Sequence, residues 1–197
     1  METQQNSKPM LYIKHMVCPR CIYLIRTELE RLNIAVKEIQ LGTVEFMQPL
    51  MEDEFSAVKT ALEKFGFEII QDQKSRIVEQ IKTLVIDLIR YSKEPISIKY
   101  SEFLARETGK DYSMLSNLFS GSENITIEKY IILQKIEYVK ELLTYDELSL
   151  SQIAAKLSYS DLGYLSRQFK EITGKTPTEY KKQRFNDRKP LNDINPD

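Results

Sequence analysis

An internal repeat constrains this chain more than any other feature of its sequence. The stretch LARETGKDYSMLSNLFS (104–120) aligns without a gap with AAKLSYSDLGYLSRQFK (154–170), at a constant offset of 50 residues. A constant offset of this kind indicates two copies of one supersecondary unit. The matched pairs are Ala105 with Ala155, Asp111 with Asp161, Leu115 with Leu165, Ser116 with Ser166, Phe119 with Phe169, Thr126 with Thr176 and Tyr130 with Tyr180.

Each copy is predicted to form a helix, a short turn and a second helix. In the second copy the expected helices cover 150–158 and 162–173, and Asp161 between them has a residue type that caps helix N-termini. The small Ala155 would let the two helices cross closely, as a helix-turn-helix requires. The residues expected to face inward from the second helix are Leu165, Phe169 and Ile172.

The outward side chains of each second helix are candidates for reading DNA, because a recognition helix contacts base edges through its first turns. Asn117 occupies the position of Arg167, and since Asn pairs with adenine while Arg prefers guanine, the first copy should be more A·T-directed. The alternative is a helical hairpin with a solvated face, and the phosphate contacts expected of Lys170, Lys175 and Lys181 could equally be solvated charges. The candidate base-contacting residues are Ser113, Ser116, Asn117, Leu162, Gly163, Ser166, Arg167 and Lys170.

Residues ~80–184 resemble the DNA-binding domain of the AraC/XylS family of bacterial transcription regulators. The resemblance rests on YSKEPISI (91–98), on the long segment 126–154 and, most specifically, on SYSDLGYLSRQFKEITGKTPTEYKK (158–182). It implies two helix-turn-helix units joined by a linker helix over roughly 126–143, reading two successive major grooves of double-stranded DNA. The first copy departs from the family in lacking Arg and Lys on its recognition helix, so dimerisation or an effector would be needed for tight binding.

The N-terminal part has a different, mixed α/β pattern. Its elements follow the order βαββαβ, which is the split βαβ or ferredoxin-like arrangement. The fold class predicted for the whole chain is therefore an α+β ferredoxin-like domain followed by an all-α tandem helix-turn-helix domain. The expected strands cover 10–15, 35–42, 43–49 and 67–70, and the expected helices cover 21–32 and 56–65, with Ser56 as the N-cap of the latter.

Four segments result. They are a ferredoxin-like domain (10–71), a connecting helix (75–94), a DNA-binding domain (95–184) and a disordered tail (186–197). In the connecting helix, an apolar stripe favours packing on the following domain. The alternative is a homodimer seam, because apolar residues from Ile77 to Tyr91 are spaced alternately four and three positions apart; this pattern is called the four-three alternation below. Pro95 is expected to end this helix.

The segment KHMVCPRCIYL (14–24) contains both cysteines and the single histidine of the chain. Cys18 and Cys21 would lie at the start of a helix, where free N–H groups and the helix dipole lower a thiol pKa. Two thiolates at this spacing can hold a Cu(I)-like ion or supply half of a tetrahedral zinc site, with His15 as a third candidate ligand. A regulatory disulfide, a thioredoxin-like C-P-x-C, and a scaffold that senses nothing are the alternatives.

The same segment resembles the heavy-metal-associated domain of copper chaperones and metal-pumping ATPases. The matching residues are Met16, Cys18 and Cys21 in M-x-C-x-x-C, together with GFE (66–68). The resemblance implies binding of Cu(I) or another soft metal ion, with Met16 packed in the core rather than ligating. His15 departs from the family, which usually has glycine there, and Arg20 could offset the charge of a bis-thiolate complex.

The composition fits this interpretation without adding to it. Hydrophobic residues make up 42% and charged residues 29%, the formal net charge is −1, and neither an export signal nor a membrane-length apolar run is visible. We therefore expect a cytoplasmic, non-enzymatic transcription regulator that senses a soft metal ion or thiol redox state through Cys18 and Cys21. The alternatives are an AraC-type regulator whose first domain serves dimerisation or partner binding, and a metal chaperone or redox protein with a helical appendage.

Overall fold

The computed structural model describes residues 10–92, 99–145 and 147–183, which divide into two compact units within residues 1–83 and 84–197. The predicted helix stop at Pro95 and the predicted disordered tail 186–197 lie outside the described residues. Within the described ranges, no helix is long and apolar enough to cross a membrane.

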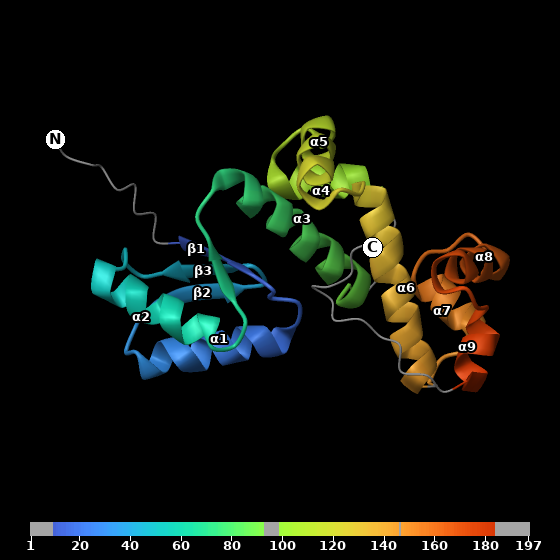
Figure 1. The fold of residues 1–197 in the computed structure, drawn as a ribbon, viewed down its shortest axis with the longest axis horizontal. Helices are drawn as coiled ribbons and strands as arrows, with labels where there is room; N and C mark the ends of the chain where they lie inside the picture. Colours follow the sequence, from blue (N-terminus) through green and yellow to red (C-terminus); the bar gives the residue numbers. More distant parts are fainter. Residues whose placement is uncertain (1–9, 93–98, 146, 184–197) are drawn as a thin grey trace. The chain divides into compact units, whose positions relative to one another are not determined.

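The first unit contains a four-stranded antiparallel sheet with the strand order β2-β3-β1-β4. Its elements follow the order βαββαβ that the sequence predicts (Figure 1). They are β1 (Met10–Lys14), α1 (Pro19–Arg31), β2 (Val36–Gln40), β3 (Thr43–Phe46), α2 (Glu52–Glu63) and β4 (Glu68–Ile70).

The core of this unit lies between one face of the sheet and the two helices α1 and α2 (Figure 1). Strand residues alternate between faces, so Ile13 enters the core while its neighbour Tyr12 does not. Burial of each apolar side chain of this size stabilises the folded state by about 1.5–3 kcal/mol. The buried residues at its centre are Ile13, Met16, Ile25, Leu29, Val44, Val58 and Leu62.

The start of α2 differs from the prediction. Ser56 is not its N-cap, because the helix begins at Glu52 and the backbone N–H of Met51 donates to Glu54 Oε2 at 2.8 Å. The first turn carries Glu52, Asp53 and Glu54, whose charges are favourable at a helix N-terminus. The apolar pattern used for the prediction begins only after this acidic turn, which is why it placed the start too late.

The connecting helix α3 (Gln73–Arg90) begins on the other face of the sheet. The guanidinium of Arg76 lies 4.9 Å from the centre of the Tyr12 ring, and its Nε donates to the carbonyl of Ile70 at 3.3 Å. Ile81 is fully buried, whereas Tyr91 is 39% exposed, so the four-three alternation is not a continuous exposed stripe. Packing therefore accounts for the first half of the helix.

The second unit is all-helical and is organised along α6, the linker helix (Figure 1). The predicted linker over 126–143 is observed as Ile127–Tyr145. One helix pair lies at each end of it, and an ion pair between Arg90 Nη1 and Glu141 Oε2 ties the last turn of α3 to α6. The helices are α4 (Tyr100–Thr108), α5 (Tyr112–Glu123), α6, α7 (Leu150–Lys156), α8 (Leu162–Thr173) and α9 (Pro177–Gln183).

The internal repeat is confirmed in the packing of this unit. Each copy buries a leucine and a phenylalanine from its second helix, and a tyrosine 11 residues after the phenylalanine packs on its ring. The ring centroids are 5.4 Å apart for Phe119 and Tyr130, and 5.5 Å apart for Phe169 and Tyr180. Each second helix also ends at a left-handed residue, Asn124 or Gly174.

Candidate nucleic-acid interface and thiol site

The second helix of the second copy, α8, is fixed at its start by a side-chain cap. Asp161 Oδ1 accepts the backbone N–H of Tyr164 at 2.7 Å, which confirms Asp161 as the N-cap. This hydrogen bond is the main cause that lowers the pKa of Asp161, and the nearby charge of Arg167 acts in the same direction. Leu165 and Phe169 are fully buried, so the rotation of the helix about its axis is fixed as well.

That rotation leaves the predicted contact residues on the outside. Leu162 is 38% exposed, and Gly163, Arg167 and Lys170 are exposed while Ser166 is half-buried. These positions share one side of the first three turns, the part of a recognition helix that reaches base edges.

One packing prediction for this copy is wrong. Ala155 is exposed, so it does not lie where the two helices cross; the buried small residue is its neighbour Ala154. Ala154 and Ile153 face inward together from α7. The inward positions that helical periodicity predicts for α7, Ile153, Ala154 and Leu157, are confirmed, and only the role given to Ala155 is wrong.

Gly163 leaves room beside the arginine that the sequence singles out. A Cβ at position 163 would lie 3.0 Å from Asp161 Oδ1 and 3.4 Å from Arg167 Nη1. The first distance is short for a carbon and the second is at the limit of ordinary contact, so a side chain here would press on the N-cap and lie against the guanidinium. The glycine thus keeps the cap and the arginine undisturbed on the outer face of α8.

The second helix of the first copy, α5, has the same cap and a different surface. Asp111 Oδ1 accepts the backbone N–H of Ser113 at 2.8 Å and also accepts the Ser113 hydroxyl, and these bonds lower the pKa of Asp111. Ser113 and Asn117 are exposed, and Ser116 is half-buried. Since the Ser113 hydroxyl donates to the cap, Asn117 carries the polar group best placed to pair with a base.

Two exposed apolar side chains on these helices were not predicted as contact residues. Met114 on α5 is 43% exposed and Tyr164 on α8 is 45% exposed. They occupy the same position of the repeat, since their numbers differ by 50. The repeat register could have identified them, because the position holds a large apolar or aromatic residue in both copies.

Of the lysines expected at phosphates, Lys170 and Lys175 precede α9 and Lys181 lies in its last turn. Lys170 and Lys181 are exposed and Lys175 is half-buried. Glu179 lies among them, and hydrogen bonds from Thr176 lower its pKa, with the charges of Lys170 and Lys175 acting in the same direction. The positive charge at this end of the unit is therefore partly balanced by a carboxylate.

The two cysteines come together at the start of α1. Cys18 is the N-cap residue, Cys21 follows one turn later, and their sulfur atoms are 3.6 Å apart without a disulfide. Both thiols are half-buried. Met16 is fully buried in the core, which confirms that it packs rather than ligates.

The expected lowering of the thiol pKa is wrong for Cys21. Burial raises the pKa of this thiol, and hydrogen bonding to the backbone of Val17 and Cys18 opposes the increase without cancelling it. Loss of water around a thiolate therefore outweighs the helix N-terminus at this position.

The donor set fits a soft ion bound by two thiolates. Two metal–sulfur bonds of about 2.3 Å span roughly 3.8 Å at a tetrahedral angle and about 4.6 Å when linear. The observed 3.6 Å is close to the first value, so linear coordination requires the sulfurs of Cys18 and Cys21 to separate by about 1 Å. His15 Nδ1 lies 2.9 Å from the carbonyl oxygen of Gly66, and the described residues contain no group of three or more metal-ligating side chains.

Comparisons with known proteins found a match to a helix-turn-helix domain within the second unit. A family model described as a helix-turn-helix domain matches residues 104–183. The Msm operon regulatory protein of Streptococcus mutans serotype c (strain ATCC 700610 / UA159) is 26% identical over 132 residues, which are 66% of this chain and 45% of that protein. An uncharacterized HTH-type transcriptional regulator of Escherichia coli (strain K12), YijO, is 27% identical over 96 residues, which are 46% of this chain and 34% of the relative.

A solved structure was also found to be similar in part. The C-terminal domain of AraT, a response regulator from Geobacillus stearothermophilus, has a TM-score of 0.49 at 22% identity, covering 57% of this chain and 88% of that one. The chain spans less than half the length of the two curated relatives described above. Residues 104–183 are thus similar to a helix-turn-helix domain, and the two relatives are named as a regulatory protein and an HTH-type transcriptional regulator.

Proposed function

We propose that this protein is a DNA-binding transcription regulator of AraC type that acts on double-stranded DNA in the bacterial cytoplasm. The observation that carries the proposal is the duplicated helix-turn-helix. Both second helices, α5 and α8, are capped by an aspartate, bury a leucine and a phenylalanine, and expose other side chains of their first turns. Two such helices on one linker helix suit two successive major grooves, about one helical turn apart. The proposed DNA-binding domain covers residues 95–184.

Selection from a pool of random duplexes tests this proposal. The full chain should enrich a sequence with two short conserved blocks about 10 base pairs apart, and its affinity should fall steeply with salt as phosphate contacts release counterions. Arg167→Ala should abolish conservation in one block, whereas Arg106→Ala removes the same charge from the exposed side of α4 and should leave both blocks intact. Enrichment of no sequence at any salt concentration would exclude the proposal.

We further propose that residues 10–71 form a ferredoxin-like domain of the heavy-metal-associated type, in which Cys18 and Cys21 sense Cu(I), another soft metal ion or thiol redox state. Support comes from the 3.6 Å separation of the two sulfurs and from their partial exposure at the N-terminus of α1. Both thiols are partly accessible to solvent, so an ion can approach both. When bound, such an ion would join two thiolates and remove their protons.

The sensing proposal is tested with reduced protein under anaerobic conditions. DNA affinity is measured with and without one equivalent of Cu(I), beside the variants Cys18→Ser and Arg31→Ala, the latter an exposed control at the end of α1. A metal-dependent shift in affinity that Cys18→Ser loses and Arg31→Ala keeps supports the proposal. Equal affinity in all samples, together with no metal bound at equilibrium dialysis, contradicts it.

A second candidate function is homodimerisation through the connecting helix α3, or binding of a protein partner there. The partial exposure of Leu84, Leu88 and Tyr91 on α3 favours this candidate, since these are the later members of the four-three alternation. Sedimentation of the full chain distinguishes the two. A homodimer that Leu88→Glu dissociates, with metal-independent DNA binding, would favour dimerisation.

A further inference from the structure

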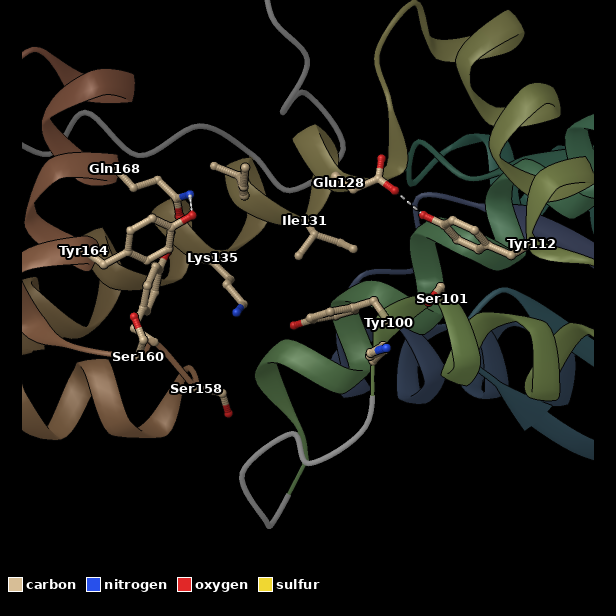
Figure 2. Close-up of a pocket in the computed structure, with 13 residues that line it drawn as sticks. Tyr100, Ser101, Tyr112, Glu128, Ile131, Lys135, Ser158, Ser160, Tyr164 and Gln168 are labelled. Carbon is tan, nitrogen blue, oxygen red and sulfur yellow. Dashed lines mark hydrogen bonds between the residues drawn. The ribbon is translucent and has the colours of Figure 1, made fainter.

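A cavity of about 680 Å³ lies in the second unit, on α6 and between the two helix-turn-helix copies. This volume is in the range of small-molecule sites. Four tyrosines line it, and Ile131 of α6 lies between the two ends of the cavity (Figure 2). The aromatic residues are Tyr100 of α4, Tyr112 of α5, Tyr159 of the turn before α8, and Tyr164 of α8.

One end of the cavity holds a lysine whose charge is poorly compensated. The ammonium of Lys135 donates to the carbonyl of Leu157 at 2.8 Å and lies 5.4 Å and 5.0 Å from the ring centres of Tyr100 and Tyr159. Among the described residues no carboxylate lies within ion-pair distance of it. An ammonium has three N–H donors, and the described residues provide one acceptor.

The hydroxyl of Tyr100 is a second group that lacks a partner. It is buried and has no hydrogen-bond partner among the described residues. The ring of Tyr100 is one of the two that flank the Lys135 ammonium, so the two polar groups belong to the same end of the cavity. A buried polar group without a partner is costly, which makes this end of the cavity suited to an oxygen-bearing ligand.

The other end has the opposite polarity. The Glu128 carboxylate accepts a hydrogen bond from the hydroxyl of Tyr112, and that bond is the main cause that lowers the pKa of Glu128 (Figure 2). Glu128 and Lys135 are seven residues apart on the same face of α6, about 10 Å along the helix axis. A ligand with an anionic group at the Lys135 end must therefore keep anionic groups away from the Glu128 end.

We propose that this cavity binds a small aromatic monocarboxylate, whose carboxylate lies between Lys135 Nζ and the Tyr100 hydroxyl and whose ring packs among the tyrosines against Ile131. The charge of the carboxylate compensates the lysine, and the flat apolar body fits the aromatic walls. Because Tyr112 and Tyr164 belong to the first turns of α5 and α8, such a ligand would touch both recognition helices. That consequence for DNA rests on the proposed function, whereas the binding itself does not.

The affinity should depend on pH in a defined direction. Burial lowers the pKa of Lys135 to about 8, so the lysine is cationic at pH 7 and largely neutral at pH 9. The other charged or titratable groups facing the cavity are Lys99, Glu128 and the tyrosines; burial raises the pKa of Tyr100, Tyr112 and Tyr159. Carboxylate binding should therefore weaken as the pH rises through 8.

Titration calorimetry of the full chain with 2-naphthoate, in the absence of DNA, tests this proposal. We expect 2-naphthoate to bind at pH 7 at least tenfold more tightly than the neutral 2-naphthalenemethanol or 2,6-naphthalenedicarboxylate, and less tightly at pH 9. Lys135→Met should lower the affinity at least tenfold, and Tyr100→Phe about three- to tenfold. Lys135→Arg should keep the affinity and lose the pH dependence, because a guanidinium stays protonated.

Several results would overturn the proposal. These are no binding of 2-naphthoate at millimolar concentration, equal binding of the neutral analogue, or unchanged affinity in a folded Lys135→Met variant. If circular dichroism shows that Lys135→Met does not fold, the proposal is tested by the other two variants, Tyr100→Phe and Lys135→Arg, and by the pH dependence of the native chain. Since no DNA is present, these results are independent of whether the chain binds an operator.

Discussion

The two helix-turn-helix copies share an interior and differ in their surface. Both second helices start at an aspartate cap and bury a leucine and a phenylalanine completely. On the outside, Asn117 in α5 corresponds to Arg167 in α8, and the exposed Ser113 corresponds to Gly163. The comparison shows that the buried positions maintain the unit while the outward positions differ in what they can recognise.

The turns between the helices also differ. In the first copy the left-handed residue after the first helix is Gly109, and the cap Asp111 follows two residues later. In the second copy it is Ser158, three residues before the cap Asp161, and the extra length carries Tyr159, whose hydroxyl donates to Gln168 Oε1 at 2.7 Å. The second turn thus supplies Tyr159 to the lining of the cavity on α6, whereas the first copy has Gly109 at the equivalent position of the repeat.

The largest expected effect comes from breaking the shared interior. Leu115→Ala and Leu165→Ala each remove a fully buried side chain, so each should lower the free energy of unfolding by about 2–5 kcal/mol. Urea denaturation followed by circular dichroism measures both, with the exposed Leu162→Ala as a control that should change stability little. A large loss at one leucine and a negligible loss at the other would mean that the copies are not equivalent in their packing.

A smaller effect, on DNA binding alone, should separate the two surfaces. Arg167→Ala should reduce affinity for the selected duplex by about 1–3 kcal/mol, as loss of a bidentate contact to guanine does. Asn117→Arg should change the preferred base at the corresponding position of the other block from adenine towards guanine. Fluorescence anisotropy with single-base variants of the duplex measures both changes.

The control for this pair is Arg106→Ala, which removes an exposed arginine from the non-recognition helix α4. It should shift affinity slightly and equally for all duplexes, because a general charge effect has no base preference. Identical base preferences in the native chain and in Arg167→Ala would refute the assignment of α8 as a base reader.

The sequence predicted those features that repeat or alternate. The offset of 50 identified the two copies, and Asp161, Leu165 and Phe169 take the positions expected of them. The order βαββαβ followed from apolar periodicity and turn residues. Both kinds of inference succeed because burial imposes a period on the sequence.

Features set by three-dimensional surroundings could not be predicted in this way. The raised pKa of Cys21 depends on how much water the folded loop excludes, and the spacing of the cysteines does not contain that information. The same holds for the Lys135 ammonium, which lies near rings of two residues that are 35 and 24 positions away in the chain. Ala155 shows a related failure, since its place in the repeat suggested a role at the helix crossing, whereas the structure exposes it.

The smallest expected effects come from the two glycines within the second helices, α5 and α8. Gly121→Ala in α5 meets no atom within 4 Å, so it should raise the free energy of unfolding by about 0.5–1 kcal/mol through the unfolded chain and leave DNA binding unchanged. Gly163→Ala in α8 places a carbon 3.0 Å from Asp161 Oδ1 and 3.4 Å from Arg167 Nη1. The gain in the free energy of unfolding is therefore offset by displacement of the cap or the guanidinium. Its DNA affinity should fall, by less than in Arg167→Ala, because the arginine is displaced rather than removed. Thermal unfolding and anisotropy on the same two variants measure these effects, and a Gly163→Ala variant with native affinity and the full stability gain would show that the space beside Arg167 has no role in recognition.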